Sequence, residues 1–424
     1  MTIFKAKESN VQTYANSFPT RFTKAQGCWL FDDQGKRYID FLAGAGALNY
    51  GHNHPELKKA LIDYITADGV THGLDMHTDA KANFIARFDE IILRPRHLDY
   101  RFQFTGPTGT NAVEAALKLA RKVTGRANIV AFTNGFHGVS YGALAATGNQ
   151  HHRGGAGVPL SGVSRIPYQG YAGIDGLSLF ETQLSDRSSG LDKPAAVIVE
   201  CVQGEGGLNV ATPEWLKRLE QICRQHNILL IVDDIQAGCG RTGTFFSFEP
   251  SGIKPDLVVL SKSIGGYGLP MSIVLLKPEL DQWAPGEHNG TFRGNNHAFV
   301  TAAKALDLFW QTNELSQHID ARAKQLNQHL QKQLKLHPEL FVNLKGRGLM
   351  QGIACQNGDI ASAISQACFE RGMIIETAGP EGQVVKFFCP LTISEAEMEQ
   401  GIHHFIEAAA KVAKAQNSHS RKAS

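Results

Sequence analysis

The chain has 424 residues, of which 42% are hydrophobic and 19% are charged, and its formal net charge is +2. That length allows a large core and more than one domain, and the composition is typical of a globular enzyme. The nearly balanced charge favours neither nucleic acid nor an anionic membrane as a partner, and no apolar run reaches the length of a membrane span.

The seven cysteines are scattered along the chain, with no CxxC pair and no metal-ligand spacing. They are therefore expected to be reduced thiols, and no metal site is predicted. The first residues, 1–7, lack the apolar core of a signal peptide. Together these features predict a cytoplasmic protein.

The expected secondary structure follows one pattern through the middle of the chain. After a hairpin expected over residues 27–41, apolar strands alternate with helices from about Arg101 to Lys277, as in βαβ units on a parallel sheet. The expected strands are Asn128–Phe132, Ala195–Glu200, Ile228–Asp233, Leu257–Ser261 and Ser272–Leu276, and the expected helices are Asn111–Val123 and one that begins at Thr212.

The last third of the chain is expected to form long helices over residues 296–312 and 313–334, then strands Asn343–Ala354 and Val384–Thr392. From Ala413 onward a frayed, polar tail is expected. The chain is thus predicted to be an α/β protein whose large domain, residues 59–312, holds a mostly parallel sheet with helices on both faces. A smaller α+β domain comprises residues 313–424, and residues 1–58 contribute to it.

Two of the predicted strands lead directly into an ionisable side chain. The strand Ile228–Asp233 ends at Asp233 and the strand Leu257–Ser261 leads into Lys262, each with glycine a few residues further on. A buried strand of a parallel sheet delivers such a group to its carboxyl edge, where α/β proteins bind ligands. An acid and an amine at neighbouring strand ends suit pyridoxal 5′-phosphate, which bonds to a lysine and whose ring nitrogen pairs with an Asp.

Two glycine-containing loops, Thr105–Asn111 and Gly290–Asn296, precede predicted helices. Free backbone N–H groups and threonine hydroxyls in such loops donate hydrogen bonds to a phosphate. The distance between the loops in sequence leaves open that the second comes from a partner subunit. Taken alone, each loop fits an ordinary capped helix equally well. In the first loop, Thr108 and Thr110 add hydroxyl donors.

Between these loops lie an aromatic side chain and two carboxylates. Phe136, next to His137, follows a strand end, where a ring can lie flat on a planar cofactor, although this segment alone favours a core phenylalanine. Glu200 and Glu205 lead from another buried strand into a tight turn, and each needs a cation if it is buried. For Glu200, a structural salt bridge is the preferred interpretation.

No single segment decides the function, but the order and spacing of these segments do, with Asp233 and Lys262 about one βαβ unit apart. From about Trp29 to Thr392 the chain resembles the class III (ω-) aminotransferases, which have the type I fold of pyridoxal phosphate enzymes. Segments that carry this resemblance are Tyr38–Leu42, Gly51–Pro55, Val113–Ala120, Gly238–Gly243, Gly346–Met350 and Pro390–Ile393.

Within that class, a closer resemblance is to the diaminobutyrate–2-oxoglutarate transaminases of ectoine biosynthesis. It rests on fewer positions, in the segments Gly44–Tyr50, Gly73–Thr78, Pro107–Asn111 and Pro285–His297. This resemblance implies transfer of the amino group of L-glutamate to L-aspartate 4-semialdehyde, which yields 2-oxoglutarate and L-2,4-diaminobutyrate.

The class resemblance also implies a role for each candidate residue. Lys262 would bond to the cofactor and act as the catalytic base, and Asp233 would pair with the ring nitrogen. Gln236 would contact the ring hydroxyl, and Phe136 would stack on the ring. Thr291 would reach the phosphate from the neighbouring subunit of a homodimer. The full cofactor-binding set is Thr108, Gly109, Thr110, Phe136, His137, Asp233, Gln236, Lys262 and Thr291.

Two positions depart from the class pattern. Many members carry Arg directly after an aromatic-His-Gly triplet, where it binds a substrate carboxylate, and here that position is Val139. Many also carry an Arg that pairs with the turn glutamate, and here it is Lys386, a point charge rather than a bidentate fork. We expect Glu205 to neutralise Lys386 while the semialdehyde reacts, and to swing away when Lys386 binds a carboxylate of glutamate.

Three alternatives to this function remain open at this point. One is another ω-aminotransferase, acting on ornithine, 4-aminobutyrate or a siderophore precursor. The second is a pyridoxal phosphate aminomutase, and the third is a catalytically silent homologue. The presence of Asp233, Gln236 and Lys262 argues against the silent homologue.

Overall fold

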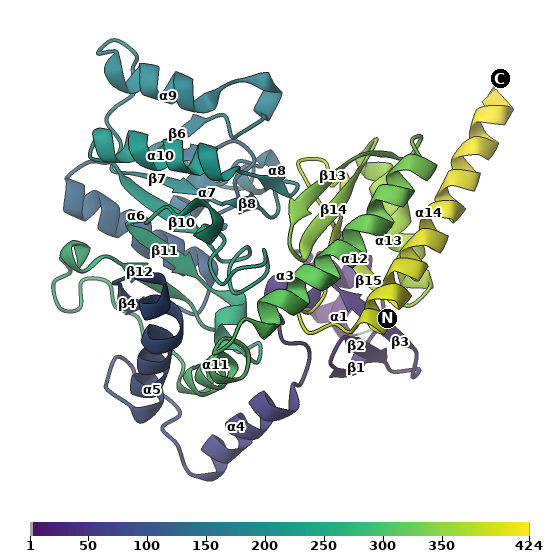
Figure 1. Cartoon of the computed structure of the whole chain (residues 1–424), viewed down its shortest axis with the longest axis horizontal. Coiled ribbons are helices and arrows are strands. Elements are labelled where there is room, and N and C mark those ends of the chain that lie inside the picture. Colours follow the sequence, from purple (N-terminus) through teal and green to yellow (C-terminus); the bar gives the residue numbers. More distant parts are fainter. Residues whose placement is uncertain (1–2, 424) are drawn as a thin grey trace.

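The computed structural model describes residues 3–423, with side chains up to residue 416. Its strands form two seven-stranded sheets and one small two-stranded sheet. Figure 1 shows the two large sheets in separate halves of the molecule. The two-stranded sheet pairs β8 (Val202–Gln203) with β9 (Asn209–Val210).

The first large sheet is mostly parallel, because only β12 runs antiparallel to its neighbours. Its central strands are short runs of Val, Ile, Leu, Ala and Phe with no exposed residue, as expected for strands covered on both faces. In spatial order the strands are β4 (Arg101–Phe104), β12 (Ile273–Leu276), β11 (Leu257–Leu260), β10 (Leu229–Asp233), β7 (Ala196–Val199), β5 (Ile129–Phe132) and β6 (Val163–Ile166).

The second large sheet combines strands from both ends of the chain. A meander from the N-terminal region joins it through a parallel pairing of β3 with β15. In spatial order the strands are β1 (Phe22–Gln26), β2 (Trp29–Asp32), β3 (Arg37–Phe41), β15 (Met373–Ala378), β16 (Val384–Phe387), β14 (Met350–Cys355) and β13 (Phe341–Arg347). The domain boundaries at residues 58 and 312 stay a proposal.

The helices flank the sheets and connect them. The α-helices are α1 (Ile3–Lys7), α2 (Tyr14–Ser17), α3 (Ala43–Gly46), α4 (Pro55–Thr66), α5 (Asp79–Phe88), α6 (Gly109–Thr124), α7 (Tyr141–Ala146), α8 (Gln150–Arg153), α9 (Gly176–Ser185), α10 (Pro213–Gln225), α11 (Asn296–Phe309), α12 (Glu314–Leu336), α13 (Gly358–Glu370) and α14 (Glu395–Ala423). Short π or 3-10 turns are η1 (Asp89–Leu93), η2 (Arg94–Arg96), η3 (Tyr171–Gly173), η4 (Glu249–Ser251), η5 (Lys262–Gly265) and η6 (Pro278–Leu280).

Helix α6 shows how the sequence builds the first half of the molecule. Its predicted apolar face is confirmed, since Val113, Ala116, Leu117 and Ala120 are all buried in a core cluster with strands of the first sheet. The helix is capped by Gly125, whose φ of 68° is a left-handed conformation that glycine adopts without a steric penalty. The buried face fixes α6 on the sheet and thereby places its N-terminus at the sheet edge.

Three expectations for the C-terminal part are corrected. The single strand expected over Asn343–Ala354 is two strands, β13 and β14, because Gly348 (φ 64°) forms the turn between them. The strand expected to reach Thr392 ends at Phe387, shortly before Pro390, which has no N–H for a ladder. The tail expected to fray from Ala413 continues α14 to Ala423.

No helix within residues 3–423 combines the length and the apolar character needed to cross a bilayer.

Candidate active site

The ends of two adjacent strands bring the predicted acid and amine to one edge of the first sheet. Strands β10 and β11 are parallel neighbours, with Asp233 paired in register with Val259. Lys262 follows β11 at the start of η5 with φ 55°, a left-handed conformation that costs a non-glycine residue of order 1–3 kcal/mol. Its Nζ donates to the carbonyl oxygen of Ala45 at 2.7 Å. Burial lowers the pKa of Lys262, which favours the free amine that a nucleophile and base needs.

Asp233 is buried and held in place by a histidine. Its Oδ2 lies 2.7 Å from Nδ1 of His137, and its Oδ1 accepts a hydrogen bond from the backbone N–H of Ile235. The neighbouring Asp234 points elsewhere and accepts from the backbone N–H of Ser247 at 3.0 Å. Burial raises the pKa of Asp234 to about 7. The two aspartates therefore have different environments, and His137 contacts the one at the strand edge.

The first predicted phosphate loop forms an open cradle at the N-terminus of α6. The backbone N–H groups of Gly109 and Thr110 have no acceptor among the described residues, and the Thr108 hydroxyl does not cap the helix. A Cβ at Gly109 would lie 2.8 Å from Cδ1 of Ile235, so a larger residue there would have to displace that side chain. The Thr110 hydroxyl is 2.6 Å from the hydroxyl of Ser140. Unpaired N–H groups at the start of a helix form a ready anion site.

Phe136 and Glu200 meet beside the contact of His137 with Asp233. Phe136 is partly buried, and its backbone N–H donates to Oε2 of Glu200 at 3.0 Å. Glu200 also accepts from the backbone N–H of Gly204, and no cation within residues 3–416 pairs with it. The expected salt bridge of Glu200 is therefore wrong, because backbone donors take the place of the cation. Burial raises the pKa of Glu200 to about 7, Asp233 adds to the increase and His137 opposes it.

The predicted pair Glu205–Lys386 exists and lies beside Gln236. Nζ of Lys386 is 3.1 Å from Oε1 of Glu205 and 3.1 Å from Oε1 of Gln236, and the lysine side chain is fully buried. Gln236 also donates to Glu205 at 3.0 Å and to the carbonyl of Ala45, which is the acceptor of Lys262. Although burial opposes the effect, Lys386 and Lys262 lower the pKa of Glu205 to about 2.

A second acid on Lys386 was not predicted from the sequence. Glu376 of β15 faces Lys386 across the antiparallel pairing with β16, and its Oε1 lies 2.9 Å from Nζ. The hydroxyl of Tyr14 donates to the other oxygen of Glu376 at 3.1 Å. The two carboxylates together raise the pKa of Lys386 against the effect of its burial. Lys386 is thus a buried cation between two acids, and it keeps one of them if Glu205 moves away. A carboxylate inside the apolar strand Met373–Ala378 was the available signal for Glu376.

Among the described residues, neither Thr291 nor Val139 makes a hydrogen bond to this cluster. Thr291 is exposed and has no hydrogen-bond partner within residues 3–416. Val139, at the position where an arginine was missing, is 59% exposed and offers no donor side chain. The structure of one chain therefore brings together all of the predicted residues except Thr291. Among the described residues, no group of three or more His, Cys, Asp or Glu side chains is placed to hold a metal ion.

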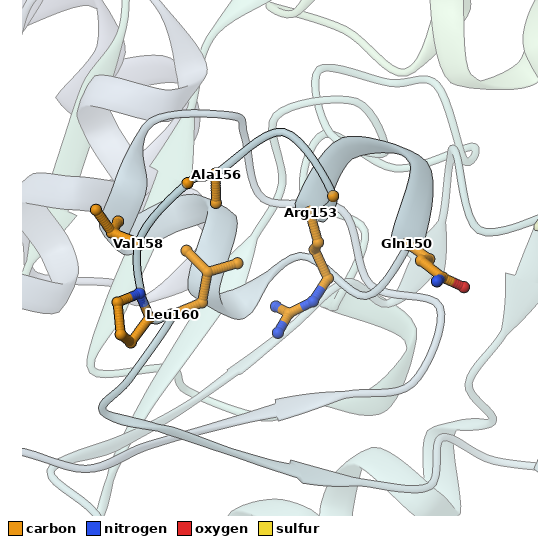
Figure 2. A pocket seen from close by; sticks show the side chains of 8 residues that line it. Gln150, Arg153, Ala156, Val158 and Leu160 are labelled. Atoms are coloured by element: carbon orange, nitrogen blue, oxygen red, sulfur yellow. The ribbon is translucent and has the colours of Figure 1, made fainter.

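Two cavities lie near α8. Figure 2 shows the first, of about 490 Å³, where Arg153 and Leu160 point into a hollow that contains none of the predicted residues. Arg153 there donates to backbone carbonyls, including that of Thr147. The second cavity, of about 370 Å³, adjoins the predicted site, because Phe136 and Glu205 belong to its lining.

The arrangement fits pyridoxal 5′-phosphate. The α6 cradle would hold the phosphate, Asp233 would pair with the ring nitrogen, Gln236 would reach the ring hydroxyl, and Lys262 supplies the amine. The family model described as "Aminotransferase class-III" matches residues 11–409. The chain therefore belongs to the class III aminotransferases, and pyridoxal 5′-phosphate is its cofactor.

Several relatives are similar over nearly their whole length. A diaminobutyrate–2-oxoglutarate transaminase of Vibrio parahaemolyticus is 66% identical over 413 residues, which cover 97% of this chain and 98% of the relative. The protein of the same name from Vibrio cholerae is 68% identical over 402 residues, which cover 95% and 98%. Among solved structures, an ornithine aminotransferase of Toxoplasma gondii has a TM-score of 0.85 at 27% identity, covering 98% of this chain and 94% of that one.

Proposed function

We propose that this chain transfers the amino group of L-glutamate to L-aspartate 4-semialdehyde, giving 2-oxoglutarate and L-2,4-diaminobutyrate, the first step of ectoine biosynthesis. The observation that carries the proposal is the identity of 66% and 68% to two diaminobutyrate–2-oxoglutarate transaminases over nearly full length. A cytoplasmic location stays a prediction, supported by seven cysteines that are all buried and unpaired.

The chain's own side chains have distinct tasks in this proposal. When bound, the cofactor supplies an electron-accepting ring that carries the amino group from one substrate to the other. Nζ of Lys262 takes the proton from the reacting carbon of the substrate and returns a proton in the opposite half-reaction. The carboxylate of Asp233, fixed by His137, keeps the ring nitrogen protonated.

One site must accept two kinds of reacting carbon. In glutamate that carbon carries a carboxylate, whereas in the semialdehyde it does not. The cluster of Glu205, Lys386 and Gln236 adjoins Lys262 through the shared contact with Ala45. Lys386 would receive the glutamate carboxylate when Glu205 moves away, and Glu205 would return to Lys386 for the semialdehyde. Glu376 pairs with Lys386 throughout, so that the buried lysine never lacks a counter-charge.

The test is an acceptor screen with L-glutamate as donor and 2-oxoglutarate as the measured product. The expected result is a higher kcat/KM for L-aspartate 4-semialdehyde than for succinic semialdehyde or glutamate 5-semialdehyde. A preference for either of the latter would assign the chain to a 4-aminobutyrate or ornithine type instead. Absence of 2-oxoglutarate with every acceptor would overturn the transaminase activity and favour the aminomutase.

Glu205→Ala and Lys386→Ala are expected to damage opposite half-reactions. Without Glu205, the semialdehyde step should suffer more, because its carboxylate can be captured by Lys386 in the wrong register. Without Lys386, the glutamate step should lose a charge-assisted contact of about 1.5–3 kcal/mol. Single-turnover kinetics of each half-reaction measure both effects.

Glu376→Gln is the matched control for the Glu205–Lys386 pair, because it removes the other acid, which is expected to stay paired with Lys386. Its effect should not reproduce the selective loss of the semialdehyde step. Equal damage to both half-reactions in Glu205→Ala and Lys386→Ala would mean that the ion pair is only structural.

We also propose a homodimer in which Thr291 completes the phosphate site of the neighbouring subunit. The exposed, unpartnered hydroxyl of Thr291 supports this assignment. Thr291→Ala should weaken cofactor retention, because a hydrogen bond to a charged phosphate is lost. The measurement is the cofactor content after gel filtration at limiting pyridoxal phosphate.

Mixing Thr291→Ala chains with Lys262→Ala chains tests whether the site is shared. A mixed dimer places both defects in one site and leaves the other site intact, so that activity should exceed the mean of the two parents. If mixing restores no activity beyond that mean, Thr291 does not act across the interface.

A further inference from the structure

The 370 Å³ cavity beside the site is lined in part by residues to which the proposed function assigns no role. It opens between the segment of Phe136, helix α8 and the turn after β15. Phe136, which is predicted to stack on the cofactor ring, and Glu205, which pairs with Lys386, form one part of the lining. His152 and Glu381 form other parts of it. Glu205 thus belongs both to the cavity wall and to the hydrogen-bonded cluster that adjoins Lys262.

His152 is one of the side chains in this lining that can donate a hydrogen bond, together with the amides of Asn134, Asn149 and Gln150. It is partly buried, and its ring packs edge-on against Phe136 with the centroids 5.2 Å apart. No hydrogen bond within residues 3–416 uses either of its ring nitrogens. Burial lowers the pKa of His152, and the neighbouring His151 lowers it further, while Glu205 opposes both. A neutral imidazole still carries one N–H donor.

The lining also contains a carboxylate that is free to meet a cation. Glu205 is committed to Lys386 and Gln236, whereas the side chain of Glu381 has no partner among the described residues. The cavity thus combines neutral donors, among them His152, with one unpaired acid, the exposed Glu381. An α-amino-acid end, which carries a carboxylate and an ammonium group together, matches this combination, and a simple carboxylate does not use the acid.

We propose that this cavity binds the α-amino-acid end of the semialdehyde, with the N–H of His152 donating to its carboxylate and Glu381 facing its ammonium group. The proposal rests on the proposed function, because it names the residues that select this acceptor. It also accounts for Val139, since His152 supplies the carboxylate donor that the exposed valine cannot.

His152→Ala and its neighbour His151→Ala form a matched pair for the test. His151 precedes His152 on α8, is exposed and does not line the cavity. His152→Ala should raise the KM for the semialdehyde about tenfold or more, with kcat nearly unchanged, because a hydrogen bond to a charged group is lost. His151→Ala should leave both constants unchanged, and His152→Gln, which retains an N–H donor, should recover part of the affinity.

Binding of L-homoserine gives a readout that is independent of turnover. It has the same α-amino-acid end but a hydroxymethyl group that cannot accept nitrogen, and calorimetry on the enzyme in its amino form measures its Kd. This Kd should rise in His152→Ala in parallel with the KM. If the alanine variant does not fold, His152→Leu keeps apolar volume against Phe136 without a donor and takes its place.

Glu381→Gln tests the second half of the assignment. Succinic semialdehyde has the same carbon chain as L-aspartate 4-semialdehyde but no ammonium group. In Glu381→Gln, the ratio of kcat/KM for L-aspartate 4-semialdehyde to kcat/KM for succinic semialdehyde should therefore fall. An unchanged KM and homoserine Kd in the His152 variants, or equal effects in His151→Ala, would overturn the assignment. A wild-type enzyme that does not use the semialdehyde would instead overturn the proposed function.

Discussion

Lys262→Ala is expected to bind pyridoxal 5′-phosphate but to lose turnover by roughly two to four decades. The loss follows because Nζ of Lys262 is the group that moves the proton at the reacting carbon. The cradle at the N-terminus of α6 does not involve this lysine, so cofactor affinity should fall without vanishing. Steady-state rates together with cofactor content per chain after gel filtration measure the two effects.

The matched control is Lys254→Ala, which removes an exposed lysine next to the start of β11. Its turnover and cofactor content should equal those of the wild type. Near wild-type turnover of Lys262→Ala would refute the assignment of this lysine. Loss of all cofactor binding would instead mean that the α6 cradle does not hold the phosphate.

Asp233→Asn is expected to retain the cofactor and lose most of the activity. A neutral amide cannot stabilise a protonated ring nitrogen as a carboxylate does, and the contact with Nδ1 of His137 loses its charge. Removing the charge of Asp233 without changing its size should therefore lower the activity. Turnover and the pH dependence of the cofactor absorbance measure the effect.

Asp234→Asn is the paired control, because Asp234 precedes the same turn but accepts from the backbone of Ser247. Burial raises the pKa of Asp234 to about 7, so a neutral amide costs little there. Activity close to wild type is expected. If Asp234→Asn is inactive and Asp233→Asn is nearly normal, the roles of the two neighbours are reversed.

The prediction of an ion pair between Glu205 and Lys386 was correct but incomplete. Glu205 and Lys386 were predicted together, and the structure places them 3.1 Å apart. Glu376 was missed because strand pairing, rather than a motif, brings it opposite Lys386. In Glu205→Ala, Lys386 therefore still has one counter-charge, which Glu376 supplies.

Much of the fold and the core of the site follow from the sequence alone. Buried strands of a parallel sheet need apolar residues along their length, so the point where a charged residue follows marks the sheet edge. That rule located Asp233 and Lys262, and the helical period located the buried face of α6. The resemblance from about Trp29 to Thr392 then indicated the class that the family model confirms.

The tertiary structure decided which side chains meet across segments that are far apart in sequence. Tyr14 reaches Glu376, His152 packs on Phe136, and the carbonyl of Ala45 receives Lys262. Neither the period of a helix nor the alternation of a strand encodes such contacts, because they depend on how separate elements pack. The same limit explains Glu200, for which the sequence indicated a buried acid and only the fold showed that backbone N–H groups satisfy it.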